Sequence, residues 1–149
     1  MNHVDTSKYF KPDMLGGIMQ YDVDMSKVGC GCISALYGVL MPGVDNSRDE
    51  FQYCDANKVG GHWCPEFDIM EANKYAFHVT GHKCDLPSGN VYNNCDRSGQ
   101  CTMDILKNSD VNDYGPNSNN KINTNRPFHV KTEFHERNRK FVGYTTTLS

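Results

Sequence analysis

The most informative stretch of the sequence is Glu66-Phe67-Asp68-Ile69-Met70-Glu71, which places three carboxylates in a short, otherwise apolar run. Its first two acids alternate with apolar residues, which is the period of a half-buried strand. Glu66 and Asp68 therefore share one face of that strand. Strict alternation would put Met70 on that face and Glu71 on the other. We expect a β-bulge between Ile69 and Glu71, because it would restore the phase and because bulges are common beside active sites.

The three acids suggest hydrolysis of a glycosidic bond. A retaining glycosidase uses a carboxylate nucleophile and a general acid whose carboxyl groups lie about 5–5.5 Å apart. On a flat strand, Glu66 and Glu71 would have Cα atoms roughly 13 Å apart, so the hypothesis requires a concave sheet. Asp68 would hydrogen-bond one Glu, and its charge would raise the pKa of the other acid. The alternatives are a solvent-facing acidic strand and a Ca²⁺ site.

Alternating apolar residues predict further strands, bounded by clusters of turn-forming residues. The expected strands are residues 16–25, 33–41, 65–73, 128–135 and 140–147, with 33–41 buried. In the fourth strand, one face should carry Phe128, Val130, Thr132 and Phe134. Residues 136–139 should form the hairpin turn that leads into the fifth strand.

The remaining stretches are expected to be loops. Residues 79–100 carry several turn signals, and residues 108–125 are so rich in Asn, Asp and Ser that we expect a long exposed loop. Helical periodicity is weak throughout. Several short strands with turns between them predict an all-β sandwich.

Residues 66–73, which end in Ala72-Asn73, resemble the Glu-x-Asp-x-x-Glu-Ala-Asn signature of glycoside hydrolase family 7, the cellobiohydrolases and endoglucanases that cut β-1,4-glucan. Other short matches keep the family's order. They are Tyr21-Asp22-Val23-Asp24-Met25-Ser26, Cys30-Gly31, Ala35-Leu36-Tyr37, Met41, Tyr53-Cys54-Asp55, Gly60-Gly61-His62, Cys64, His82, Cys84, Cys95, Cys101, Tyr114-Gly115-Pro116 and Val130 to Phe134. The resemblance covers residues 16–134, which is most of the chain.

The resemblance implies a concanavalin A-like jelly-roll β-sandwich, and the shortness of the chain implies that it is incomplete. Residues 1–149 would then be a single partial catalytic domain. In the family's terms, the catalytic residues are Glu66 as nucleophile, Asp68 as its hydrogen-bonding partner and Glu71 as general acid/base. The expected function is a retaining glycoside hydrolase that cleaves β-1,4-glucosidic bonds in an endoglucanase-like open groove. The alternatives are a non-catalytic glucan-binding relative and an inactive fragment of a longer cellulase.

Three further residues match positions of the family that contact substrate, namely Tyr37, Asp55 and His82. Each also has an ordinary structural explanation. Tyr37 fits a strand aromatic in the core, Asp55 fits a turn former, and His82 fits a loop histidine. The resemblance implies a β-1,4-glucan poly- or oligosaccharide as partner, with no metal and no cofactor. A complete domain of this kind would be a monomer.

Seven cysteines in 149 residues indicate an oxidising, extracellular compartment. By the resemblance, disulfides join Cys54 to Cys64 and Cys84 to Cys95, which leaves the pairing of Cys30, Cys32 and Cys101 open. Residues 1–15 lack the apolar core of a signal peptide, and we attribute that absence to truncation. A competing hypothesis is a zinc site, since His62 and His82 each stand two residues before a cysteine. That spacing fits no standard zinc ribbon or finger.

The charge balance argues against a nucleic-acid partner. The chain has 15 Lys and Arg against 18 Asp and Glu, a net charge of −3, whereas phosphate binding requires clustered positive charge. No apolar run reaches the roughly 18 residues of a membrane span, so we expect no membrane partner.

Overall fold

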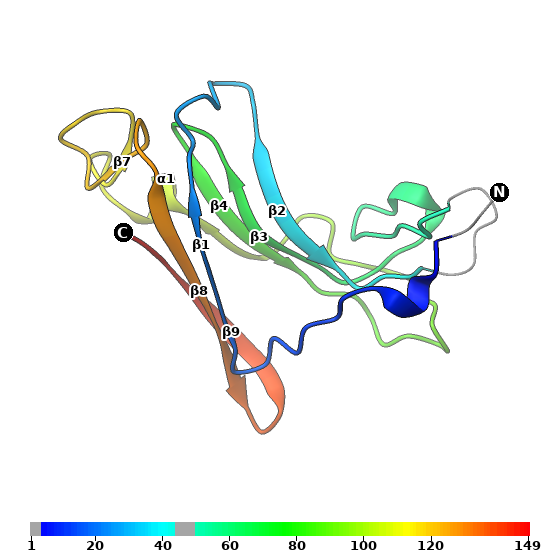
Figure 1. Cartoon of the computed structure of the whole chain (residues 1–149). Coiled ribbons are helices and arrows are strands. Elements are labelled where there is room, and N and C mark those ends of the chain that lie inside the picture. The colour runs from blue at the N-terminus through cyan, green and yellow to red at the C-terminus, as the bar shows by residue number, and fades with distance from the viewer. Residues whose placement is uncertain (1–3, 44–49) are drawn as a thin grey trace. The chain divides into compact units, whose positions relative to one another are not determined.

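The computed structural model describes residues 4–43 and 50–149, and most of its regular structure is β-strand. The strands are β1 (Ile18–Val23), β2 (Ser34–Val39), β3 (Glu66–Ala72), β4 (Phe77–His82), β5 (Cys101–Asp104), β6 (Tyr114–Gly115), β7 (Ile122–Asn123), β8 (Phe128–Arg137) and β9 (Lys140–Leu148) (Figure 1). The helical elements are the 3₁₀ turns η1 (Thr6–Lys8) and η2 (Val59–Gly61) and the short helix α1 (Ile105–Asn108). The predicted all-β class is confirmed.

Within the described residues the strands form sheets in the orders β1-β8-β9, β2-β3-β4-β5 and β6-β7. The chain divides into two compact units whose segments interleave. The first unit comprises Met1–Lys11, Leu36–Ile69 and Thr80–Thr102, and the second comprises Pro12–Ala35, Met70–Val79 and Met103–Ser149. Strands β2, β3, β4 and β5 each contribute residues to both units.

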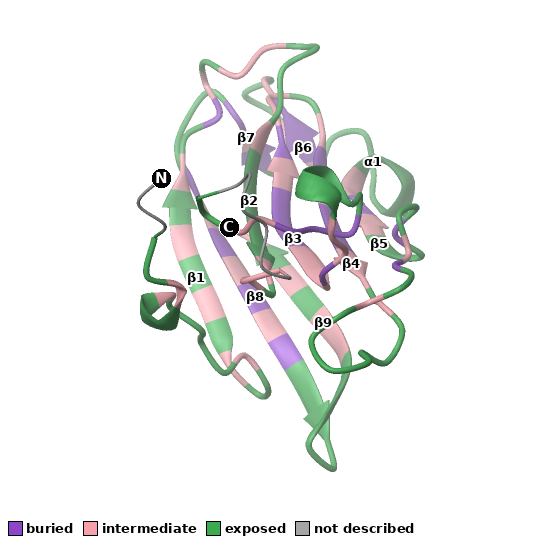
Figure 2. Ribbon diagram, turned by 90° about the vertical axis from the view of Figure 1, so that its right-hand side faces the viewer, coloured by how far each residue is buried: buried purple, intermediate pink, exposed green. Residues whose placement is uncertain are grey.

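The second unit is built around strand β8. Its inward residues alternate as predicted, since Phe128, Val130, Thr132 and Phe134 are all buried while the residues between them are not (Figure 2). Antiparallel pairing places β8 between β1 and β9. The rings of Phe77, Tyr114 and Phe128 then meet edge to face, with centroids 5.8–6.5 Å apart. Such aromatic pairs stabilise a core beyond the area that they bury.

The expectation of an exposed loop over residues 108–125 is partly wrong. Tyr114 and Ile122 are buried in the short β6–β7 pair, and Thr124 is 0% exposed. The Tyr114 hydroxyl donates to the carbonyl of Asn73 at 2.8 Å, and the Thr124 hydroxyl donates to the carbonyl of Lys74 at 2.9 Å. These anchors are single residues within polar turns, so no periodicity marks them in the sequence.

Two other sequence predictions need correction. The stretch 33–41 was expected to be buried, but β2 is an edge strand whose Leu36 and Tyr37 are 37% and 45% exposed. An apolar run therefore does not prove burial when only one side of a strand is paired. The stretch 79–100 was expected to be a loop, but its first residues complete β4, where Val79 is 0% exposed.

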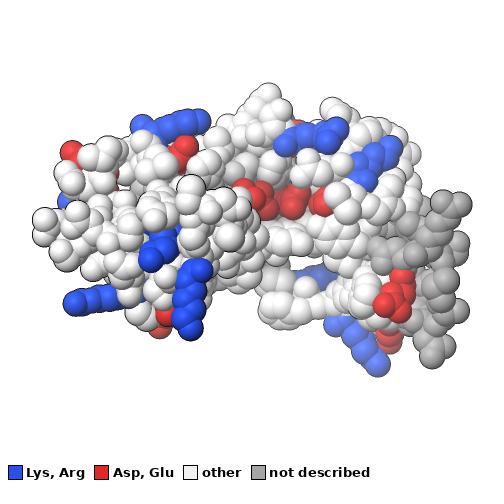
Figure 3. All heavy atoms as spheres, turned by 90° about the horizontal axis from the view of Figure 1, so that it is seen from above, with Lys and Arg blue, Asp and Glu red and all other residues white. Residues whose placement is uncertain are grey.

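The rest of the 79–100 stretch is irregular and belongs to the first unit. Disulfides join Cys54 to Cys64 and Cys84 to Cys95, the same pairs that the family resemblance implies. Among the described residues, no helix is long and apolar enough to span a membrane. On the face drawn in Figure 3, the Lys and Arg side chains stand in several separate places.

Replacing Phe77 by Ala should strongly destabilise the second unit. Phe77 is 0% exposed and contacts both Tyr114 and Phe128. Truncating a buried Phe costs about 3–5 kcal/mol of unfolding free energy, because it removes apolar burial and leaves a cavity. Urea unfolding followed by circular dichroism measures the change. Ile18→Ala is the matched control, since Ile18 is 56% exposed and surface changes cost about 0.5 kcal/mol or less. Equal losses for both variants would contradict this description of the core.

Candidate active site

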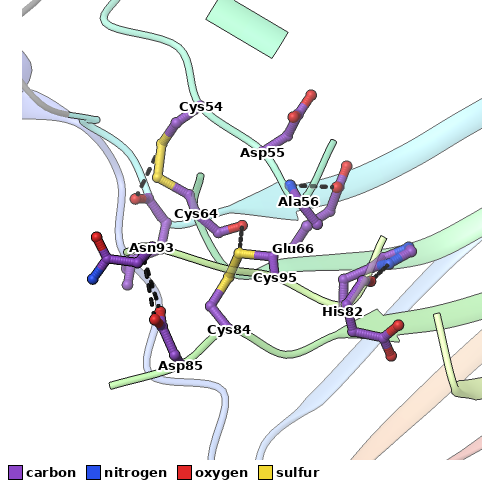
Figure 4. The surroundings of a disulfide bond; sticks show 12 residues. Cys54, Asp55, Ala56, Cys64, Glu66, His82, Cys84, Asp85, Asn93 and Cys95 are labelled. Carbon is purple, nitrogen blue, oxygen red and sulfur yellow. Dashed lines mark hydrogen bonds between the residues drawn. A yellow bond between two sulfur atoms is a disulfide. The ribbon is translucent and has the colours of Figure 1, made fainter. Parts of the chain in front are cut away.

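Glu66 opens strand β3 in the first unit and is held there by a main-chain donor. Its Oε2 atom accepts a hydrogen bond from the backbone N–H of Ala56 at 3.1 Å (Figure 4). Burial raises the pKa of the Glu66 carboxyl, and the charges of Asp68 and Asp55 raise it further. The Ala56 N–H and His82 act in the opposite direction. The Ala56 N–H therefore limits the rise in the pKa of the Glu66 carboxyl that burial causes.

Asp68 and His82 form a pair that shares a proton. His82 ends strand β4, and its Nδ1 atom lies 2.7 Å from the main-chain carbonyl oxygen of Asp96. A carbonyl only accepts, so Nδ1 must carry a hydrogen. The other ring nitrogen, Nε2, lies 3.0 Å from Oδ2 of Asp68. This contact needs one more proton, either on an imidazolium or on the Asp68 carboxyl.

The environment of the pair favours retention of that proton. The side chains of His82 and Asp68 are 9% and 11% exposed. Burial raises the pKa of Asp68 and outweighs the opposing effect of His82. At His82 burial lowers the pKa, but the hydrogen bonds to Asp96 and Asp68 and the charges of Asp68 and Glu66 raise it overall. Both pKa shifts are therefore upward.

A second network joins two of the predicted substrate-binding residues. Asp55 is 5% exposed, and its Oδ1 atom accepts from the backbone N–H groups of Asn57 and Val59, each at 2.9 Å. It is thus a turn former, as its ordinary structural explanation predicts. The Tyr53 hydroxyl hydrogen-bonds Asp55 and Tyr37, and burial, followed by these contacts, raises its pKa. Tyr53 is absent from the predicted site residues, although it directly precedes the disulfide cysteine Cys54.

The structure thus gathers most of the predicted site residues in the first unit. Glu66, Asp68, His82 and Asp55 interact there, while Tyr37 joins through Tyr53. Glu71 lies near the end of β3 in the second unit and is partly buried. Its catalytic role, and the bulge between Ile69 and Glu71, stay predictions.

The cysteines bear on the metal hypotheses. Cys64 and Cys84 are both in disulfides, so neither has a thiol to offer, and the His-x-Cys zinc hypothesis is wrong. Cys30 and Cys32 are exposed and lie outside both disulfides. Ligand atoms of Glu66, Asp68 and His82 lie within 4.8 Å of one another, a spacing that a cation would fit. We interpret this group as a carboxylate, Glu66, beside a proton-sharing pair, because Asp68 and His82 already hydrogen-bond each other.

Two curated relatives have sequences similar to this one. Endoglucanase 1 of Pyricularia oryzae is 30% identical over 158 residues, which cover 86% of this chain and 37% of that protein. Endoglucanase type C of Fusarium oxysporum is 32% identical over 157 residues, which cover 85% of this chain and 37% of that protein. The chain thus spans little more than a third of the length of these curated relatives.

Two solved structures share the fold over 91% of this chain. The native structure of a Humicola insolens endocellulase matches with a TM-score of 0.74 at 28% identity, over 41% of its own chain. An endoglucanase I in complex with cellobiose matches with a TM-score of 0.76 at 24% identity, over 42% of its own chain. The chain therefore has the jelly-roll fold of these proteins over part of their length.

The family-level comparison covers the acidic strand, both disulfides and the C-terminal hairpin. Residues 43–148 match the model of glycosyl hydrolase family 7. With the two endoglucanase relatives and the shared fold, this match shows that the chain belongs to glycosyl hydrolase family 7.

Proposed function

We propose that this chain carries the reacting acids of a retaining β-1,4-glucanase, with Glu66 as nucleophile, Asp68 as its partner and Glu71 as general acid/base. The observation that carries the proposal is the environment of Glu66. One carboxylate oxygen is fixed by the Ala56 N–H, beside an Asp68–His82 pair that holds a proton. Family membership and the endoglucanase names of the relatives support the same reaction class.

The proposed reaction has two steps. In the first, a Glu66 carboxylate oxygen attacks the anomeric carbon, while Glu71 gives its proton to the departing glycosidic oxygen. A covalent glycosyl ester on Glu66 results, and the rest of the glucan leaves with a free hydroxyl. In the second step Glu71 takes a proton from water, whose oxygen attacks the same carbon and releases Glu66. Two inversions give net retention.

The neighbours of Glu66 suit its role as nucleophile. The Ala56 N–H binds Oε2 and leaves Oε1 for attack. A carboxylate next to a second full negative charge would be hard to ionise. Because Asp68 shares a proton with His82, the repulsion that Glu66 feels is reduced. The Asp68–His82 pair therefore lowers the negative charge next to the proposed nucleophile.

The proposed substrate is an uncharged β-1,4-glucan. Tyr37 is 45% exposed and can offer its ring to a sugar, whereas Asp55 is buried, the His82 side chain is only 9% exposed, and both would shape the site from beneath. We propose an open, endoglucanase-like groove and one partial catalytic domain over residues 1–149. The two disulfides support an extracellular setting.

Glu66→Gln and Glu71→Ala should each abolish most of the turnover. The chain, produced under oxidising conditions, is assayed for release of the aryl group from an aryl β-cellobioside. Loss of a positioned acid/base costs about 10²–10⁴-fold in rate, and loss of the nucleophile should cost at least as much. Added azide should restore turnover to Glu71→Ala alone, because the anion can attack the glycosyl ester without a general base.

Glu133→Gln on β8 is the matched control, since Glu133 pairs with Lys131 on the second unit's sheet. It should retain parental turnover. A folded parent that binds cello-oligosaccharide without cleaving it would refute the catalytic proposal and favour the glucan-binding alternative. An aggregated parent would favour the inactive-fragment alternative.

The stability of the chain should fall as the pH rises past the ordinary pKa of histidine, which is 6.5. The pKa of His82 is higher in the folded chain, so the folded state binds this proton more tightly than the unfolded state does. That contribution is complete below the unfolded pKa and is lost as the pH rises through the folded one. Urea unfolding across a pH series that brackets 6.5 measures the slope.

His82→Gln should flatten the slope in this window. His135→Gln is its control, because His135 is exposed on β8. Among the interactions described, its ring contacts only the hydroxyl of Thr145. A parental slope in His82→Gln would show that His82 does not hold the extra proton.

A further inference from the structure

The loop over residues 55–63 contains a contact between a lysine and the chain's single tryptophan. Lys58 Nζ lies 4.0 Å from the centroid of the Trp63 ring, a cation–π geometry. Lys58 is exposed and has a left-handed backbone with φ of 64°, which is uncommon for a residue other than glycine. Such a conformation persists only where the surroundings hold it. The contact with Trp63 is one such restraint.

Other restraints hold the base of this loop and the residues on either side of Lys58. The Cys54–Cys64 disulfide closes it, and the backbone N–H of Cys64 donates to the carbonyl of Asp55 at 3.0 Å. The Asp55 carboxylate binds the N–H groups of Asn57 and Val59. The Lys58–Trp63 contact is different, because it joins the tip of the loop to the segment before β3 through side chains alone.

The loop supplies a hydrogen-bond donor to Glu66. Ala56 lies between the base and the tip, is 0% exposed, and points its N–H at Oε2 of Glu66. Figure 4 shows this bond beside the Cys54–Cys64 disulfide. Movement of the tip would therefore be transmitted to the donor that holds the nucleophile.

We propose that Lys58 and Trp63 are positioning residues, whose contact holds the Ala56 N–H against the Oε2 atom of Glu66. The effect of this contact on catalysis rests on the proposed function, whereas its effect on the position of the Ala56 N–H is independent of that function. Nothing in the motif of three acids requires either residue.

The charges that face Glu66 define the expected effect. They are Asp68 on the same strand, His82 from β4 and Asp55 from the loop. The Ala56 N–H favours the ionised form of Glu66, whereas burial, Asp68 and Asp55 favour the protonated form. Loosening the loop removes the donor and leaves the opposing influences in place. The pKa of Glu66 should then rise.

The test compares Lys58→Met, which removes the cation, with Lys58→Arg, which keeps it. Titration of carboxyl-¹³C-labelled glutamate by NMR, assigned with Glu66→Gln, follows Glu66 directly. In Lys58→Met the Glu66 midpoint should move upward by about one unit, a tenfold change in proton affinity. The acid limb of kcat/KM on the aryl cellobioside should move by the same amount. Lys58→Arg should match the parent in both measurements.

Two controls separate positioning from a general loss of structure. Circular dichroism and thiol titration should show a parental fold and an intact Cys54–Cys64 bond. Fluorescence of Trp63 should change in Lys58→Met, because this tryptophan is the only one in the chain. Lys58→Gln is a second neutral variant for use if the methionine variant does not fold.

Altered Trp63 fluorescence with an unchanged Glu66 midpoint would overturn the proposal, since the contact would then be structural only. Equal shifts in Lys58→Met and Lys58→Arg would overturn it as well, because the cation would be irrelevant. A parent without turnover would refute the proposed function, yet the NMR titration would still decide the positioning role. The two failures are therefore distinguishable.

Discussion

The hydrogen bond from His82 to the main-chain carbonyl of Asp96 is the constraint on which the candidate site depends. It fixes a hydrogen on Nδ1, and so the contact between Nε2 and Asp68 cannot exist without a further proton. The charge beside Glu66 follows from that requirement. A histidine free to exchange tautomers could accept from Asp68 or donate to it, and the net charge next to the nucleophile would then vary. The backbone of a loop thus fixes a hydrogen on one ring nitrogen of a side chain on β4.

The pKa of Glu66 reflects burial, which raises it, against one main-chain donor, which lowers it. A hydrogen bond to a charged group contributes about 1.5–3 kcal/mol, and one pKa unit corresponds to about 1.4 kcal/mol. A single N–H can therefore offset part of the rise in pKa that burial causes. Since Glu66 is only half-buried, solvent screens both influences. Burial remains the larger influence, so the pKa of Glu66 is raised, and loss of the Ala56 donor should raise it further.

The parts of the fold that could be predicted are those in which side chains repeat. In β8, inward Phe128, Val130, Thr132 and Phe134 alternate with polar neighbours, and that regularity is visible in the sequence. In β4, Thr80 and Gly81 interrupt the apolar pattern just after Val79, so the strand is hidden. Burial of β2 was mispredicted because an apolar run does not reveal whether a strand lies at the edge of a sheet. Hydrophobic periodicity predicts the local conformation of a segment, but it does not show which segments pack beside it.

The same distinction explains which parts of the candidate site could be predicted. Glu66 and Asp68 are recognisable because their side chains carry the chemistry and their spacing is characteristic, whereas His82 was singled out only by the family resemblance. Their partners are different in kind. Ala56 contributes an N–H and Asp96 a carbonyl, groups that every residue other than proline possesses. No residue type marks those positions: Ala56 lies inside the loop closed by Cys54–Cys64, and Asp96 directly follows Cys95 of the second disulfide. The acids can therefore be predicted from residue type, whereas the burial and the main-chain partners that shift their pKa values cannot.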